Sequence, residues 1–128
     1  MREINFSYIL QHQETGMMVD VIFNLSEIEN GLFGKMISKG GLYERYGLLS
    51  VRRPVEHKDK NGIDVYEGDI LTHGKHKLLC VFEQGCFQFE CRIGEHSGLS
   101  MTFRDHSSYE FEIIGNRFQN PELIPEQL

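Results

Sequence analysis

The chain has 128 residues, of which 40% are hydrophobic and 25% are charged, and its formal net charge at neutral pH is −6. This composition is that of an average globular protein, and a chain of this length is expected to bury roughly two-thirds of its extended surface on folding. No apolar run approaches the roughly 20 residues that span a bilayer, and the N-terminus alternates polar with apolar residues instead of carrying a signal-peptide core, so we expect a cytoplasmic protein with no membrane partner.

The first predicted elements form a β-hairpin. From Ile4 to Leu10, apolar residues occupy every second position, which is the pattern of a strand with one buried face. The run Met17–Phe23 is apolar and rich in β-branched residues, and it follows closely. We therefore predict antiparallel pairing of the two strands, with Gly16 supplying a positive φ at the turn.

The next segment has a weaker pattern. Ser26 and Glu29 have the spacing of a helix capping box, but Asn30 and Gly31 follow so soon that only one or two helical turns are predicted. Residues 40–50 place apolar side chains at roughly helical spacing, yet three glycines in the same stretch weaken any helix. The sequence leaves the structure of residues 40–50 open.

A charged, polar stretch at Arg52–Gly62 divides the chain, and it ends in the Asn-Gly turn dipeptide. Residues 1–55 carry six basic and six acidic side chains, whereas residues 56–128 carry seven basic and thirteen acidic ones. We therefore predict a small N-terminal part over residues 1–55, with the hairpin and a short helical segment, and an acidic domain over residues 56–128.

The acidic part consists of short strand-like runs separated by turn residues. Such spacing is typical of a small antiparallel barrel or sandwich and makes the chain mainly β, α+β overall. We expect Asn120–Pro125 to form an extended arm, because proline disfavours helix in the residue before it, with Leu123 and Ile124 docking on the core. The predicted strands are Ile63 to Tyr66, Ile70 to Thr72, Leu78 to Phe82, Phe87 to Cys91, Leu99 to Phe103 and Tyr109 to Ile114.

Carboxylates gather around a glycine at Asp64, Glu67 and Asp69, which raises the question of a catalytic or metal site. We interpret them as turn residues, because Gly68 can take a positive φ and Asp69 can accept hydrogen bonds from nearby amides.

Two histidines, His73 and His76, lie three residues apart near Cys80. Zinc needs three or four converging ligands, so we interpret this segment as a solvated hairpin tip and predict no metal. A hydrolase or metal enzyme that uses these histidines is the third alternative, and it rests on their spacing only.

The three cysteines, Cys80, Cys86 and Cys91, form no CxxC pair. We expect reduced thiols buried among apolar strand residues, with no nucleophile and no cofactor. No nucleophile elbow and no glycine-rich phosphate loop is present in the sequence, so no catalytic residue is predicted.

A local nucleic-acid site is the alternative, because small barrels bind single strands with a few aromatic residues and a basic groove. Lys75, Lys77 and Arg92 are its candidate contacts, flanking Phe87 or Phe89. We favour an inward, core-filling role for these phenylalanines, since period-two aromatic residues in a small barrel normally point inward.

Three sets of residues along the chain form a recognisable pattern. They are Asp59-Lys60-Asn61-Gly62 with Tyr66-Glu67-Gly68-Asp69-Ile70, the closing Glu112-Ile113-Ile114-Gly115-Asn116 with Asn120-Pro121-Glu122-Leu123, and the opening Arg2-Glu3-Ile4-Asn5-Phe6. In these motifs and their order, the sequence resembles the YopX family of phage and prophage proteins. The resemblance implies a small SH3-like barrel in the C-terminal part, joined to a smaller N-terminal part. It implies no catalytic residue and no cofactor.

From this resemblance we expect a phage or prophage accessory protein that is not an enzyme and that binds a protein through its barrel surface or its strand edges. The partner is a phage or host protein or a second copy, which would make a homo-oligomer. The alternative is a single-stranded nucleic-acid-binding barrel in phage replication or regulation.

Overall fold

A computed structural model describes residues 4–73, 76–83, 86–91, 99–102 and 111–124. Over these residues the protein is mainly β with two short α-helices, so the predicted fold class is confirmed at this level. The chain divides into two compact units, Met1–Pro54 and Val55–Leu128. No helix within the described ranges is long and apolar enough to cross a membrane.

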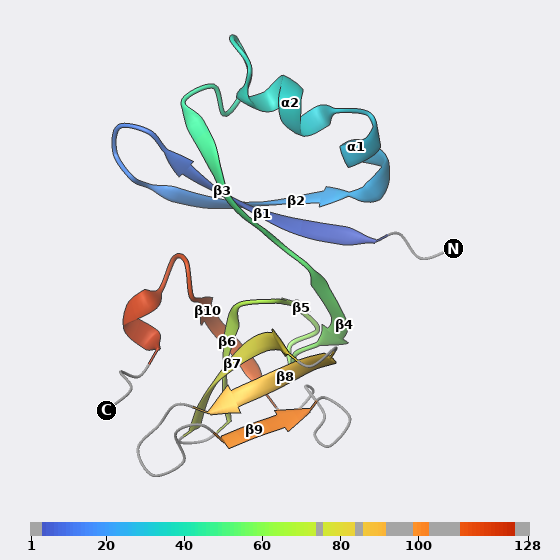
Figure 1. Ribbon diagram of the computed structural model, residues 1–128, viewed down its shortest axis with the longest axis vertical. Coiled ribbons are helices and arrows are strands. Elements are labelled where there is room, and N and C mark those ends of the chain that lie inside the picture. Colours follow the sequence, from blue (N-terminus) through green and yellow to red (C-terminus); the bar gives the residue numbers. More distant parts are fainter. Residues whose placement is uncertain (1–3, 74–75, 84–85, 92–98, 103–110, 125–128) are drawn as a thin grey trace. The chain divides into compact units, whose positions relative to one another are not determined.

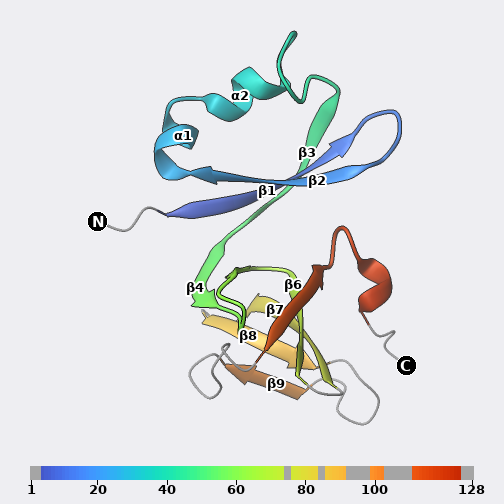
Figure 2. The same ribbon diagram turned by 180° about the vertical axis from the view of Figure 1, so that it is seen from behind.

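The first unit is a three-stranded antiparallel sheet with two helices on one side (Figures 1 and 2). Its strands are β1 (Asn5–His12), β2 (Met18–Asn24) and β3 (Tyr46–Arg52), in the order β2-β1-β3. The helices α1 (Leu25–Glu29) and α2 (Leu32–Ile37) lie between β2 and β3 in the chain. The predicted hairpin is confirmed: β1 and β2 pair from Asn5↔Asn24 to Gln11↔Met18, and Gly16 has φ 76°.

The core of this unit lies between the sheet and the helices. Tyr8, Leu10 and Phe23 are buried there, and Phe33 of α2 packs against them. The ring centroid of Tyr8 lies 4.8 Å from that of Phe23 and 5.1 Å from that of Phe33. Tyr8 and Leu10 are two of the period-two positions, so the pattern identified this face of β1. The prediction of a single buried face is wrong, because Ser7 and Ile9 on the opposite face are fully buried as well.

The N-terminus of α1 was predicted two residues too late. The cap is Asn24, whose side chain accepts a hydrogen bond from the Glu27 backbone N–H at 2.8 Å, while the Glu27 side chain accepts one from the Asn24 N–H at 2.9 Å. Asn24 and Glu27 have the capping-box spacing, as Ser26 and Glu29 do. The earlier pair takes the cap because β2 ends at Asn24.

The segment over residues 40–50, left open by the sequence, contributes β3. This strand pairs with β1 from Ser7↔Arg52 to His12↔Tyr46, with a bulge at Leu49 that shifts the register between Ile9 and Leu10. Tyr43 and Tyr46 both pack on the core, as apolar residues at helical spacing would. They do so without a helix, because Tyr43 lies in a turn and Tyr46 begins β3.

The second unit contains a two-stranded sheet and a five-stranded antiparallel sheet. The first pairs β4 (Pro54–Lys58) with β5 (Asp64–Tyr66). The second has the order β10-β6-β7-β8-β9, in which the last strand returns beside the first. This sheet is open, since β9 and β10 form its two edges within the described ranges. Its strands are β6 (Asp69–His73), β7 (His76–Glu83), β8 (Cys86–Cys91), β9 (Leu99–Thr102) and β10 (Glu112–Asn116).

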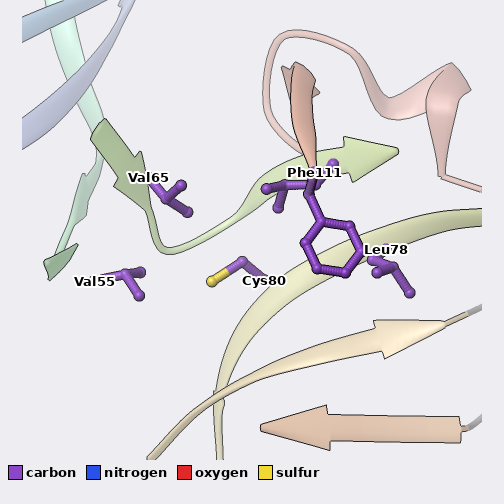
Figure 3. Close-up of a cluster of buried hydrophobic side chains, with 6 residues drawn as sticks. Val55, Val65, Leu78, Cys80 and Phe111 are labelled. Atoms are coloured by element: carbon purple, nitrogen blue, oxygen red, sulfur yellow. The ribbon is translucent and has the colours of Figure 1, made fainter. Parts of the chain in front are cut away.

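Two apolar clusters stabilise the second unit. One contains Val55, Val65, Leu71, Leu78, Cys80 and Phe111 (Figure 3). The other contains Ile70, Leu79 and Val81, with Leu123 and Ile124 packed against it. The docking of Leu123 and Ile124 is confirmed, but the arm is not fully extended, because Pro121–Leu123 forms the 3₁₀ turn η3. Proline at the first helical position is compatible with such a turn.

Candidate functional site

Asp59 is the most buried carboxylate among the side chains that are described in the second unit, with 1% of its surface exposed. One carboxylate oxygen accepts hydrogen bonds from the backbone N–H groups of Asn61 and Ile63, both at 2.9 Å. The other accepts one from the N–H of Ile113 in β10 at 3.1 Å. The side chain thus joins its own turn to a strand 54 residues away.

These contacts determine the protonation state of Asp59. Burial raises the pKa of this carboxyl, but the three backbone N–H groups, together with the charge of Lys60, outweigh burial and hold the pKa below its ordinary value of 3.8. Asp59 is therefore ionised at neutral pH, and both of its oxygens are engaged by the main chain. It has the environment of a structural anion, not of a general base.

The other three carboxylates of this region do not converge on a site. Asp64 forms an exposed ion pair with Lys58 at 2.9 Å. Asp69 is buried and accepts a hydrogen bond from the Tyr66 N–H at 2.8 Å, across a turn in which Gly68 has φ 89°. Glu67 is half-buried and makes another interaction within the chain. No group of three potential metal ligands exists among the residues whose side chains are described.

The closing motif likewise forms a turn. The Asn116 side-chain oxygen accepts hydrogen bonds from the N–H groups of Phe118 and Gln119 at 3.0 and 2.8 Å. The side-chain oxygen of Asn120 accepts one from the Asn116 N–H at 3.2 Å. Gly115 is required beside this turn, because a Cβ atom there would lie 2.4 Å from that Asn120 oxygen. Both internal motifs of the sequence thus encode backbone geometry.

The predicted basic contacts are only partly within the described structure. Lys77 lies in β7, half-buried and paired in register with Thr72 of β6. Lys75 and Arg92 lie outside the described residues. The backbones of Phe87 and Phe89 pair with Phe82 and Cys80, but the β8 side chains are not described, so their inward orientation stays a prediction.

The backbones of His73 and His76 face each other across the β6–β7 hairpin. Their side chains lie outside the described structure, so the hairpin-tip interpretation stays a prediction. Cys80 is a buried, reduced thiol, as predicted. Cys86 and Cys91 have described backbones in β8 but no described side chains.

The first unit contains a polar network that the sequence did not predict. The buried Arg52 donates hydrogen bonds to the Ser7 hydroxyl and to the Asp20 carboxylate, both at 2.9 Å. The Ser7 hydroxyl donates to the other Asp20 oxygen at 2.5 Å. The network joins all three strands of the sheet, and its members are up to 45 residues apart. The sequence carries no signal for it, because the period-two pattern predicts Ser7 on the exposed face of β1, whereas Ser7 is fully buried.

The outer side of β3, which we call the β3 edge, is the second feature that the sequence did not reveal. In the described structure β3 pairs with β1 alone. Leu48, Leu49 and Val51 are 47%, 44% and 41% exposed. From Tyr46 to Val51 the strand carries no charge. The outer edge of such a strand can pair with a strand from another chain.

A wide hollow of about 500 Å³ adjoins the start of the β3 edge. The β1–β2 turn, residues 11–16, forms one wall, and Gly47, Leu48 and Leu49 form the other. Within the turn, the His12 ring nitrogen Nδ1 accepts hydrogen bonds from the N–H groups of Glu14 and Thr15 at 3.1 Å. That nitrogen is therefore used to hold the turn.

A comparison with known protein families finds a match for the second unit. The family model described as YopX protein matches residues 55–125, slightly more than half of the chain. This range contains both internal motifs. The opening Arg2–Phe6 lies outside it, so the resemblance of that segment stays a prediction. No curated protein matches the sequence significantly.

Proposed function

The chain belongs to the YopX family, and from this premise we propose that it is a non-catalytic phage or prophage accessory protein that binds another protein by strand addition. The carboxylates in and between the first two motifs support the non-catalytic role. Asp59 and Asp69 accept hydrogen bonds from the main chain, and Asp64, which lies between the motifs, forms an ion pair with Lys58.

We further propose that the second unit is an SH3-like barrel. In support, β10 pairs with β6, and β6 to β9 follow as consecutive antiparallel neighbours. In a small closed barrel, the last strand lies beside the first and the strands between them follow in sequence order.

The β3 edge carries the proposal of strand addition. Natural sheet edges are usually protected by charges, prolines or covering segments. The β3 edge has a bulge at Leu49 but neither charge nor proline between Tyr46 and Val51. A partner strand would gain main-chain hydrogen bonds along this edge and apolar contacts with its exposed side chains.

Affinity capture with the full chain from infected host cells, with and without nuclease, tests this proposal. We expect a protein partner that is retained after nuclease treatment and lost with Leu49→Lys, because a lysine at the edge disfavours strand addition. Leu42→Lys is the matched control, since Leu42 is 73% exposed and lies outside β3. A partner retained equally by both variants would contradict docking on the β3 edge.

The same experiment tests the nucleic-acid alternative. Partners that disappear on nuclease treatment would indicate bridging by nucleic acid, and Lys77 is the candidate contact with a described position, on β7.

A further inference from the structure

We infer that the strand added at the β3 edge belongs to a second copy of this chain. The two β3 strands would pair antiparallel about a twofold axis perpendicular to the sheet, giving one sheet in the order β2-β1-β3-β3-β1-β2. This inference rests on the proposed function, because it names the partner for the same edge.

The first observation is that the helices leave β3 uncovered. Val51 pairs with Tyr8 and Leu48 with Leu10, so the members of each pair share one face of the sheet. Tyr8 and Leu10 are buried beneath the helices, whereas Leu48 and Val51 are nearly half exposed. The apolar face of the sheet therefore extends beyond its helical cover.

The second observation is that this uncovered surface is complementary to itself. A twofold axis perpendicular to the sheet keeps the helix-covered faces of both copies on the same side. Leu48 and Val51 of one copy then lie beside the same residues of the other, and each covers what the other leaves exposed. Such an isologous contact is the usual basis of a homodimer.

The third observation is the charge at the two ends of the strand. Glu44 precedes β3 and Arg53 follows it, and both are exposed. Antiparallel pairing places Glu44 of each copy near Arg53 of the other, whereas parallel pairing places like charges together. Arg53 need not be unpaired for this effect, because charges attract across several ångströms of solvent. Two other arginines lie at the ends of β3, and both form ion pairs within the chain: Arg45 with Glu14 and Arg52 with Asp20.

The bulge at Leu49 limits the strength of the contact. It breaks β3 into two shorter regular segments and increases the local twist. The paired surface is then small, and small interfaces are typical of weak, reversible complexes. We therefore expect dimerisation that depends on protein concentration.

Sedimentation equilibrium of the full chain, from about 1 µM to about 1 mM, tests the inference. The weight-average mass should rise from 14.9 kDa towards twice that value. Leu49→Lys should raise the dimer dissociation constant about tenfold or more, since the twofold axis introduces two lysines into one contact. Val51→Thr, which keeps a β-branched side chain, should raise it by less, and Leu42→Lys should leave it unchanged. Circular dichroism verifies that each variant is folded.

The outcomes separate this inference from the proposed function. A chain that stays monomeric over the whole range overturns self-pairing. In that case a nuclease-resistant partner sensitive to Leu49→Lys would still support strand addition by another protein, and the lack of any such partner would overturn both. A dimer unaffected by Leu49→Lys and Val51→Thr would place self-association elsewhere and also overturn the inference.

Discussion

At the scale of single residues, the polar side chains of the family motifs act on the backbone. Asp59 accepts three backbone hydrogen bonds, and Asn116 accepts two. A buried N–H group that loses its acceptor costs free energy comparable to its full desolvation. These residues are therefore explained by the stability of the second unit.

Asp59→Asn tests this role. The amide keeps one acceptor oxygen but replaces the other with an NH₂ group, which cannot accept from the backbone. We expect the free energy of unfolding of the second unit to fall by about 2 kcal/mol. Urea denaturation followed by the amide NMR signals of β6 and β7 would measure it. Asp64→Asn is the control, and its exposed pair with Lys58 should contribute about 0.5 kcal/mol or less.

The pH dependence of stability follows from the same carboxylate. Its folded-state pKa lies below 3.8, so the unfolded chain binds the proton first as the pH falls. The stabilisation is complete above the unfolded-state pKa and is lost as the pH falls through that value and then through the folded-state pKa. The difference between wild type and Asp59→Asn should therefore shrink between about pH 5 and about pH 3. A difference that stays constant over this range would contradict the assignment.

At the scale of elements, the sequence patterns predicted the structures that depend on contacts between residues close together in the chain. The period-two residues of β1 and the nearby apolar run predicted a hairpin, because its pairing spans few residues. The bonds of Asp59 to Asn61 and Ile63 likewise lie within the predicted Asn-Gly turn. The Ile113 bond and the Ser7–Arg52 contact could not be predicted, since they join residues 54 and 45 positions apart.

The start of α1 gives a direct test of two competing capping boxes. Asn24→Ala removes the observed cap and should destabilise the first unit by about 1 kcal/mol. Ser26→Ala removes the cap that the sequence alone favoured, and it should have little effect because Ser26 is exposed. Urea denaturation followed by the amide signals of β1 and β2 would distinguish them. A larger loss for Ser26→Ala would show that the helix begins later.

At the scale of the whole molecule, the charge and the family match are unevenly distributed. The net charge of −6 belongs entirely to residues 56–128, which include most of the YopX match. The exposed β3 edge belongs instead to the first unit, outside the match. The proposed interaction surface is therefore carried by the part of the chain that the family model does not cover.

The acidic charge makes a prediction about nucleic acid. We expect no retention of a labelled single-stranded oligonucleotide at physiological salt, because the surrounding field repels phosphate. Fluorescence anisotropy over a range of salt concentrations would measure it. Binding that weakens with a log–log slope of about −0.7 per contact, and that is lost with Lys77→Ala, would contradict this expectation and support the alternative function.

The Ser7–Asp20–Arg52 network has a consequence for how the first sheet assembles. If β3 slipped along β1 by two residues, its side chains would keep the same faces, so the apolar pattern alone would not forbid the error. The slip would, however, separate the buried Arg52 guanidinium from the Ser7 hydroxyl and from the Asp20 carboxylate, at a cost in stability. The network therefore selects one alignment of β3 on β1 among several that bury similar apolar surface. The same strand would offer its outer edge to a second molecule, and such pairing requires β3 to have a single register.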